Sequence, residues 1–300
     1  MELKLLTGIT IAVVGGDHRA VYVAEELLSQ GAMVKLVGHG TLAEPGVQTV
    51  GEVAAAVQGA DAVIFPLPGV SDDGCIETPG EPLPLKEEDL ASLPVGTPVF
   101  TGFARKRVSE VAGRLGLKLV EVAKRDDFAI LNSIPSAEGA IQMAMENLAT
   151  TIHSSSALIL GFGRVGSTLT RMLTGMGAKV TVVARDAAHR ARAVEMGCRA
   201  LDFGQLPSSI GEADLVFNTV PALVLTARVL KCTRADVLII DLATKPGGTD
   251  FEIAERLKRQ ALLAPSLPGK VAPKTAGRIL GRVIADLLVQ EKGLNLAVMS

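Results

Sequence analysis

The chain has 300 residues, which is enough for two domains of about 100–200 residues each. Hydrophobic residues make up 48% of the chain and charged residues 21%, which is typical of a globular protein and excludes a disordered one. The 30 basic and 32 acidic residues give a net charge of −2, which argues against a nucleic-acid partner. No run of 18 apolar residues is present, so we expect no membrane span.

The cysteines and the N-terminus indicate the compartment. Cys75, Cys198 and Cys232 are far apart and are not in CxxC spacing, so we expect neither a disulfide framework nor a zinc site. The first residues lack the basic and apolar regions of a signal peptide. A reducing cytoplasm is therefore the expected location.

The chain repeats one pattern of strand, glycine turn, helix and strand. An apolar run leads into Gly15, and a Gly-Ala pair at Gly31 precedes the next apolar run. The same pattern returns at Gly161 and Gly177, in both cases 146 positions later. Runs rich in Val and Ile suit strands buried on both faces, and their alternation with helical stretches indicates parallel βαβ units. The sequence therefore predicts an α/β fold of two tandem, doubly wound Rossmann-like domains with parallel sheets.

A long helix is expected to link the two domains. Pro135 suits a first helical turn, Ser133 or Ser136 can cap it, and apolar residues then recur at helical spacing. We expect an N-terminal substrate or partner domain over 1–134, a bridging helix over 135–151, a cofactor-binding domain over 152–275 and a C-terminal helix over 276–300. The apolar stripe of the last helix packs either on its own domain or back on the first one, and both alternatives stay open.

The second glycine turn carries a dinucleotide-binding motif. It reads Gly161-Phe162-Gly163-Arg164-Val165-Gly166, follows an apolar strand and opens a helical stretch, as a GxGxxG fingerprint requires. The first glycine makes the turn, the second lets the backbone approach the diphosphate, and the third lets helix and strand pack closely. The helix N-terminus adds N–H groups and a positive dipole. We expect these six residues to bind a nicotinamide dinucleotide.

The first glycine turn departs from that motif. Residues 15–19 read GGDHR, and Asp17 falls where the second turn has Gly163. A carboxylate there would repel a diphosphate, so we expect the first domain to keep the fold without the cofactor. The turn still lies at the carboxyl ends of the strands, where such sheets bind ligands. Asp17, His18 and Arg19 are therefore candidates for substrate contact, with capping of the first helix as the alternative.

The end of the strand Val180–Ala184 indicates which dinucleotide is used. NAD-binding domains place an acidic residue there, but Arg185 stands at this position, and Arg190 follows at a spacing that lets it reach the same group. Guanidinium groups pair with phosphate through two parallel hydrogen bonds. These residues favour NADP over NAD, although Asp186 can serve a ribose hydroxyl one residue later.

Later loops carry further candidates. Thr219, Val220 and Pro221 follow one strand of the second domain, and Asp241, Leu242 and Ala243 follow the next, so we expect both groups beside the cofactor. Lys245 supplies a positive charge in the second of these loops. Lys274 lies in a polar loop before the last helix and faces either the cofactor cleft or solvent.

Several reaction classes lack their residues. D-2-hydroxyacid dehydrogenases of this two-domain layout use a histidine in the C-terminal part, whereas the four histidines here are at 18, 39, 153 and 189. The Asn-Thr-x-Pro loop is shared with shikimate dehydrogenases, but the first domain has no matching Lys/Asp pattern. A GxSxG motif and metal-ligand histidine spacing are absent as well, so serine hydrolysis and a metal centre are not expected.

Blocks along nearly the whole chain resemble the A-subunit of dipicolinate synthase. They are residues 11–19, 125–127, 132–139, 161–166, 184–185, 218–221, 241–251 and 267–277. The resemblance implies an NADP-dependent oxidoreductase that oxidises a dihydrodipicolinate-type ring to dipicolinic acid during sporulation. It also implies the flavoprotein-like B-subunit of dipicolinate synthase as partner and a mother-cell cytoplasm as location.

The implied substrate is a ring with two carboxylates, which needs cations or N–H donors at both ends. We expect Arg19 to bind one carboxylate and Lys245 or Lys274 to bind the other. Ser133 and Ser136 are expected to orient the ring by hydrogen bonds.

Loss of a hydride and a proton makes such a ring aromatic, so the base that takes the proton need not be strong. Glu138 and Asp17 are the candidate bases, and Glu138 can instead complement the dipole of the bridging helix. Two other functions stay open, another NAD(P)-dependent small-acid dehydrogenase and a non-catalytic, regulatory NADP-binding protein. Tandem Rossmann dehydrogenases often dimerise, so a homo-oligomer stays open too.

Overall fold

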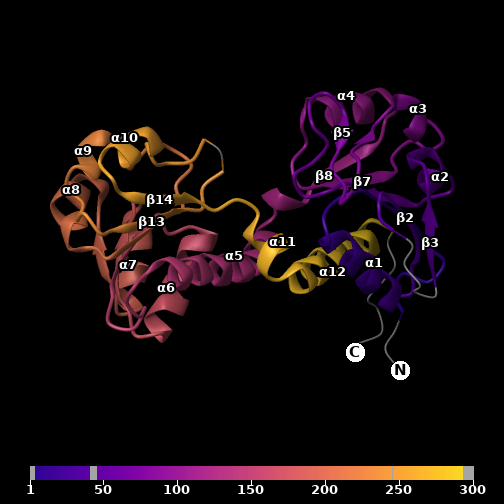
Figure 1. The fold of residues 1–300 in the computed structure, drawn as a ribbon. Coiled ribbons are helices and arrows are strands. Elements are labelled where there is room, and N and C mark those ends of the chain that lie inside the picture. Colours follow the sequence, from indigo (N-terminus) through magenta and orange to yellow (C-terminus); the bar gives the residue numbers. More distant parts are fainter. Residues whose placement is uncertain (1–3, 41–45, 245, 293–300) are drawn as a thin grey trace, which may run out of the picture. The chain divides into compact units, whose positions relative to one another are not determined.

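The computed structural model describes residues 4–40, 46–244 and 246–292. The chain divides into two compact units, one made of residues 1–131 and 272–300 and the other of residues 132–271 (Figure 1). Each unit contains a six-stranded sheet in which all strand pairs are parallel. The predicted fold class of two doubly wound α/β domains is therefore confirmed.

Unit 1 has the strand order β3-β2-β1-β4-β7-β8. Its sheet and the helices around it are formed by β1 (Thr10–Val14), α1 (Arg19–Ser29), β2 (Met33–Val37), β3 (Val47–Val50), α2 (Val53–Val57), β4 (Ala62–Ile64), α3 (Glu87–Leu90), β7 (Pro98–Thr101), α4 (Lys106–Arg114), β8 (Lys118–Glu121) and a short 3-10 helix (Val122–Lys124). Between β4 and α3, a separate antiparallel pair is formed by β5 (Cys75–Ile76) and β6 (Leu83–Pro84).

Unit 2 repeats this order as β11-β10-β9-β12-β13-β14. Its elements are β9 (Ser156–Leu160), α6 (Arg164–Gly175), β10 (Lys179–Val183), α7 (Ala187–Glu195), β11 (Arg199–Leu201), α8 (Leu206–Ser209) between two 3-10 helices (Phe203–Gln205 and Ile210–Glu212), β12 (Leu215–Asn218), α9 (Ala227–Leu230), β13 (Leu238–Asp241), α10 (Phe251–Arg256), β14 (Gln260–Leu263) and α11 (Leu267–Val271).

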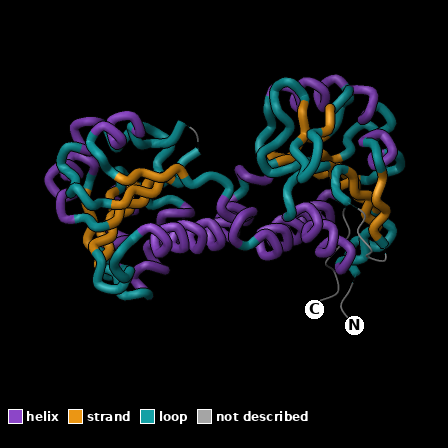
Figure 2. The backbone as a smooth tube through the Cα atoms, viewed as in Figure 1, coloured by secondary structure: helices purple, strands orange, loops and turns teal. Residues whose placement is uncertain are grey.

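Each sheet is buried on both faces, as Figure 2 shows for the orange strands and the helices around them. In β9 of unit 2, Ile159 belongs to one apolar cluster and Leu160 to another, because successive side chains of a strand point to opposite faces. In β1 of unit 1, Val13 and Val14 are divided in the same way. Burial on both faces explains why the strands read as continuous apolar runs.

The helix α5 (Asp126–Asn147) begins nine residues before the start that the sequence suggested. Pro135 lies inside it and is buried, and Ser133 lies before it in the same helix, so neither serine is a cap. Asp126 and Asp127 occupy the first turn, where negative charge complements the helix dipole. Packing of Ala137, Ala140 and Ile141 in the core of unit 2 offsets the hydrogen bond that a proline removes.

The last helix, α12 (Pro273–Glu291), lies against α1 within unit 1 (Figure 1). Gly277 and Gly281 let the two helices approach closely, since a β-carbon at either position would be closer than 3.0 Å to an atom of α1. The carboxylate of Glu26 accepts a hydrogen bond of 2.9 Å from Arg282 across this contact. Among the described helices, none is long and apolar enough to cross a membrane.

Candidate functional site

The largest pocket described in unit 2 lies at the carboxyl ends of its central strands and has a volume of about 800 Å³. This volume lies in the range of sites that hold small ligands and cofactors. Its lining comes from the turn after β9, the end of β10, the start of α7 and the loop after β12. The lining residues are Gly161, Phe162, Gly163, Ala184, Arg185, Asp186, His189, Phe203, Thr219, Val220, Pro221, Ala222 and Val224.

The glycine turn is built so that backbone faces this pocket. Gly161 has a φ of +92°, which a side chain would strain. Gly163 is the N-cap of α6, and a β-carbon there would meet no atom within 4 Å. A β-carbon on Gly166 would instead lie closer than 3.0 Å to the carbonyl oxygen of Gly161. These features fit a diphosphate, because they leave Gly163 open to a ligand while α6 packs closely on the turn.

The other residues of the predicted motif have different surroundings. Phe162 is buried, and its ring lies tilted against the ring of His189 with the centroids 6.0 Å apart. Arg164, Val165 and Gly166 belong to the first turn of α6 and do not belong to the described lining of the pocket. Of the six predicted residues, Gly161, Phe162 and Gly163 are therefore the ones that face it.

Thr219 ties the loop after β12 to the glycine turn. Its backbone N–H and its hydroxyl both donate to the carbonyl of Leu160, at 2.9 and 2.8 Å. The fully buried Asn218 shapes the same loop, since its side chain accepts from the N–H of Val220 and donates to the carbonyl of that residue. The predicted residues Thr219, Val220 and Pro221 consequently line the pocket.

Asp241 is a buried anchor for the loop after β13. Its carboxylate accepts hydrogen bonds from the Asn218 amide (2.9 Å), the Ala243 N–H (3.0 Å), the Gly248 N–H (2.9 Å) and the Thr249 hydroxyl (2.6 Å). It is fully buried, and neither it nor its neighbours Leu242 and Ala243 belong to the described pocket lining. This predicted cofactor residue therefore positions the two loops rather than facing the pocket itself.

Arg185 and Arg190, predicted to act together, are placed differently. Arg185 is exposed and lines the pocket at the end of β10. The guanidinium of Arg190 instead donates to the carbonyl oxygens of Ala184 and Arg185, at 2.9 and 2.6 Å. The guanidinium of Arg190 is thus engaged by backbone carbonyls at the end of β10, and Arg185 is the cation that lines the pocket.

Asp186 also lines the pocket, but it already serves as the N-cap of α7. Its carboxylate accepts from the N–H of Ala188 at 2.7 Å. This hydrogen bond, with smaller help from the nearby His189 and Arg190, lowers the pKa of Asp186 below its usual value. The carboxylate is therefore ionised at neutral pH with one oxygen in use, which leaves Arg185 the better partner for an anionic group.

The candidate substrate residues of α5 lie in unit 2. Ser133 is buried, and its hydroxyl is 2.6 Å from that of Thr168 on α6. The Ser136 hydroxyl donates to the carbonyl of Asn132, one turn earlier. Glu138 is exposed, and its carboxylate has no hydrogen bond or ion pair within the described part of the chain. Of the three, Glu138 alone presents a functional group that is not already engaged.

In unit 1, the chain itself covers the first glycine turn. The N–H of Gly16 donates to the carbonyl of Glu77 at 2.6 Å, and Ile76 lies against Gly15 so closely that no β-carbon fits there. An amide that a diphosphate would need is therefore already used by the segment containing β5. This is a second reason, besides the charge of Asp17, why this turn is unsuited to a dinucleotide.

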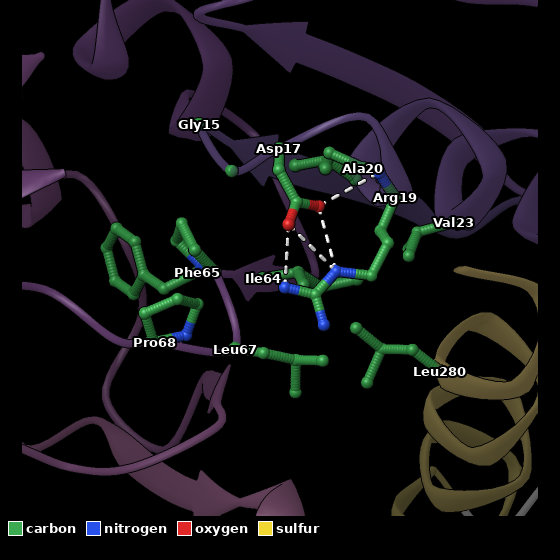
Figure 3. Close-up of a pocket in the computed structure, with 13 residues that line it drawn as sticks. Gly15, Asp17, Arg19, Ala20, Val23, Ile64, Phe65, Leu67, Pro68 and Leu280 are labelled. Atoms are coloured by element: carbon green, nitrogen blue, oxygen red, sulfur yellow. Dashed lines mark hydrogen bonds and ion pairs between the residues drawn. The ribbon is translucent and has the colours of Figure 1, made fainter. Parts of the chain in front are cut away.

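Asp17 and Arg19 form an ion pair beside a small pocket of unit 1 (Figure 3). The Asp17 carboxylate accepts from the backbone N–H, Nε and Nη2 of Arg19, with distances of 2.7 to 3.0 Å. Burial by itself would raise the pKa of Asp17, but the hydrogen bonds and charge of Arg19 outweigh it and lower the pKa. The structure thus brings these two predicted residues together.

Lys274 is exposed in the first turn of α12 in unit 1. Lys245 lies outside the described residues. Among the residues that are described, no group of three His, Cys, Asp or Glu side chains is arranged to hold a metal ion.

Sequence reasoning missed several residues of the site. His189 and Phe203 line the pocket of unit 2, although neither belongs to the glycine motif. His189 follows Asp186 by three residues in the first turn of α7, and this helical spacing was the signal that could have found it. No comparable signal marked Phe203, which enters from beyond β11.

Comparisons with known proteins place these features in a family. Residues 10–123 match the family of N-terminal domains of the dipicolinate synthase A-subunit, and residues 130–244 match the "D-isomer specific 2-hydroxyacid dehydrogenase, NAD binding domain" family. The dipicolinate synthase A-subunit of Bacillus subtilis (strain 168) is 39% identical over 290 residues, which are 95% of this chain and 98% of that protein. The chain belongs to the family of dipicolinate synthase A-subunits.

Solved structures agree with this assignment. The dipicolinate synthase A-subunit of Bacillus halodurans is 39% identical with a TM-score of 0.90, and the alignment covers 94% of this chain and 98% of that one. The Bacillus subtilis counterpart is 38% identical with a TM-score of 0.89, covering 97% and 99%. An L-alanine dehydrogenase at 17% identity, with a TM-score of 0.67 over 95% and 91% of the two chains, shares the fold alone.

Membership of this family, together with the NAD-binding domain match, makes the protein an oxidoreductase with a nicotinamide cofactor. The open Gly163, the positive φ of Gly161 and the N-terminus of α6 fit the diphosphate of such a cofactor. The pocket of unit 2 is therefore the candidate site for this cofactor.

Proposed function

We propose that this chain is the NADP-dependent catalytic component of a dipicolinate synthase. In this role it oxidises a dihydrodipicolinate-type ring, derived from the product of dihydrodipicolinate synthase, to dipicolinic acid. The observation that carries the proposal is the 39% identity to the Bacillus subtilis A-subunit, which extends over 95% of the chain and so includes both units. The name of that relative supports a B-subunit as partner, and we place the pair in the cytoplasm of the mother cell during sporulation.

The choice of NADP rests on Arg185. It is the exposed cation at the end of β10, the strand end that faces the adenosine ribose in this fold. Asp186, the residue that would favour NAD, has one carboxylate oxygen engaged as the cap of α7. A guanidinium pairs with a phosphate more strongly than with a neutral hydroxyl. These contacts support a preference for the dinucleotide that carries the additional phosphate.

The chemistry requires little from the protein beyond placement. A nicotinamide held in the pocket of unit 2 would supply the hydride acceptor, and the ring would lose a hydride and a proton to become an aromatic pyridine. Because aromatisation favours the step, a carboxylate of ordinary basicity is sufficient to take the proton. We assign this role to Glu138, which is exposed and not engaged, rather than to Asp17, which Arg19 holds and whose pKa is lowered.

One observation favours a second candidate. The match of residues 130–244 to the NAD-binding domain of D-2-hydroxyacid dehydrogenases is compatible with oxidation of a small 2-hydroxy acid. The test is a substrate panel given to the purified chain with NADP, with and without the B-subunit. We expect NADPH only with the product of dihydrodipicolinate synthase. NADPH from D-lactate or another 2-hydroxy acid, and none from that product, would replace the proposal by the second candidate.

A further inference from the structure

A second pocket lies in unit 1, at the carboxyl ends of β1 and β4 (Figure 3). Its walls are mostly apolar and include Ile64, Leu67 and, from α12, Leu280. The cavity volume is about 20 Å³, which is the space of one water-sized group. It can therefore receive the terminal group of a ligand whose body stays outside.

Arg19 is the cation of this pocket, and it is incompletely satisfied. Its side chain is 9% exposed, and Asp17 takes hydrogen bonds from Nε and Nη2. The third nitrogen, Nη1, has no hydrogen-bond partner among the described residues, and Figure 3 shows it pointing away from Asp17 toward Leu67 and Leu280. An N–H of a guanidinium that has no acceptor in the described part of the protein is available to a ligand, and hydrogen bonds from charged donors are among the stronger ones.

Two other arginine–aspartate ion pairs can be compared with the pair of Arg19 and Asp17. Arg125 pairs with Asp127 and Arg234 with Asp236, and in both cases the two residues are also separated by one position. The side chains of those two arginines are 40% and 44% exposed, so water reaches the remaining donor of Arg125, and Nη1 of Arg234 pairs with Asp214 at 2.9 Å. Arg19 has the same local geometry, but its side chain is only 9% exposed and its remaining donor faces the pocket.

The charges around the pocket favour an anionic acceptor. Asp17 is 42% exposed, so water screens its charge, whereas the buried charge of Arg19 is screened much less. Arg19 also opens α1, whose N-terminus carries a positive partial charge. A carboxylate accepts a stronger hydrogen bond from a guanidinium than a neutral oxygen does.

We propose that Arg19 binds one carboxylate of the ring substrate in the pocket of unit 1, and that Asp17 is a positioning residue that fixes the plane of the guanidinium. Asp17 accepts hydrogen bonds from two of the three guanidinium nitrogens, so the side chain of Arg19 is already ordered before a ligand binds. Binding of a ligand to the third nitrogen therefore costs little further rotamer entropy. The identity of the ligand rests on the proposed function, while the carboxylate site itself rests on the geometry of Arg19.

The experiment uses dipicolinate, the expected product, as the probe. Its affinity for the full chain is measured by calorimetry in the presence of NADPH, and NADPH affinity is measured separately by fluorescence. Arg19→Met removes the guanidinium and keeps an apolar stem. Arg19→Lys keeps the charge but lacks the fork that contacts Asp17 and a ligand together. Arg114→Met is the matched control, because Arg114 pairs with Glu87 on the surface of the same unit.

We expect Arg19→Met to weaken dipicolinate binding about tenfold or more, as loss of a charged hydrogen bond does. The KM of the ring substrate should rise in parallel, NADPH affinity should stay within about twofold, and Arg114→Met should behave as the wild type. Arg19→Lys should lie between them. If Arg19→Met does not fold, Arg19→Lys decides.

Unchanged dipicolinate affinity in the folded Arg19 variants would overturn the inference and leave the proposed function standing. A weaker affinity for dipicolinate with an unchanged substrate KM would make this an effector site and overturn its assignment to substrate. If the wild type forms no dipicolinate at all, the proposed function falls, and the binding measurements still decide whether Arg19 holds a carboxylate.

Discussion

Two glycines of the second turn are expected to respond differently to the addition of one methyl group, one through cofactor affinity and the other through stability. At Gly163 a β-carbon would meet no atom within 4 Å, and the backbone there (φ −79°, ψ −160°) is accessible to alanine. At Gly166 it would lie closer than 3.0 Å to the carbonyl oxygen of Gly161, which is a backbone atom and cannot move aside by a rotamer change. Gly163→Ala therefore tests binding, and Gly166→Ala tests packing.

The magnitudes follow from these surroundings. For Gly163→Ala, the slightly poorer helix cap and the reduced freedom of the unfolded chain nearly cancel, so stability should change by less than about 1 kcal/mol. NADPH affinity should fall about tenfold or more, which corresponds to about 1.4 kcal/mol, because the methyl group occupies the approach to the diphosphate. Gly166→Ala should cost about 3 kcal/mol, since overpacking against backbone cannot be relieved by a rotamer change.

Thermal unfolding followed by circular dichroism and NADPH titration followed by fluorescence separate the two effects. A loss of about 3 kcal/mol lowers the Tm by roughly 6–12 °C in a domain of this size. Gly163→Ala should keep the wild-type Tm and lose affinity. Wild-type NADPH affinity in that variant would refute the placement of the diphosphate at this turn, and a wild-type Tm for Gly166→Ala would refute the close packing of α6.

Four further substitutions test the site. Arg185→Asp should reverse the preference for NADP over NAD in coenzyme kinetics, and an unchanged preference would remove the case for NADP. Arg190→Met loses the hydrogen bonds to the end of β10 and should weaken the binding of both coenzymes alike. Asp241→Asn places an amide N–H group opposite a buried backbone N–H, so the free energy of unfolding should fall by about 2 kcal/mol or more in a denaturant titration. Wild-type stability of this variant would show that the four hydrogen bonds of Asp241 are dispensable. The pKa of Asp17 is lowered in the folded protein, so its ion pair stabilises the fold above about pH 4 and this contribution is lost as the pH falls through the lowered pKa. The difference in unfolding free energy between the wild type and Asp17→Asn should therefore vanish at acid pH, and a pH-independent difference would contradict this.

The tandem fold was predictable because its signals are local. Continuous apolar runs and the glycines that follow them at Gly15 and Gly161 depend on neighbours within a few residues. The start of α5 was predicted at Pro135 because proline suits a first helical turn, but packing in unit 2 keeps that proline inside the helix. Tertiary contacts therefore overrode a local preference.

The site was predictable only in part, because much of it depends on contacts between distant segments. Glu77 lies 61 positions after Gly16, and nothing in its local sequence announces the hydrogen bond that covers the first turn. Asp241 has a motif position typical of a ligand contact, yet its bonds to Thr249 and to the loop after β12 bury it. Arg19 was recognised as a candidate, but its burial depends on the return of α12 to unit 1.

The stoichiometry of the reaction tests the central proposal most directly. The purified chain with the B-subunit would receive NADP and the freshly made product of dihydrodipicolinate synthase, and NADPH and dipicolinate would be followed together by their absorption. The proposed oxidation predicts one NADPH for each dipicolinate, with both lost in Gly163→Ala at limiting coenzyme. Dipicolinate formed without NADPH, or formed equally well by the variant, would contradict a catalytic role for the cofactor site of this chain.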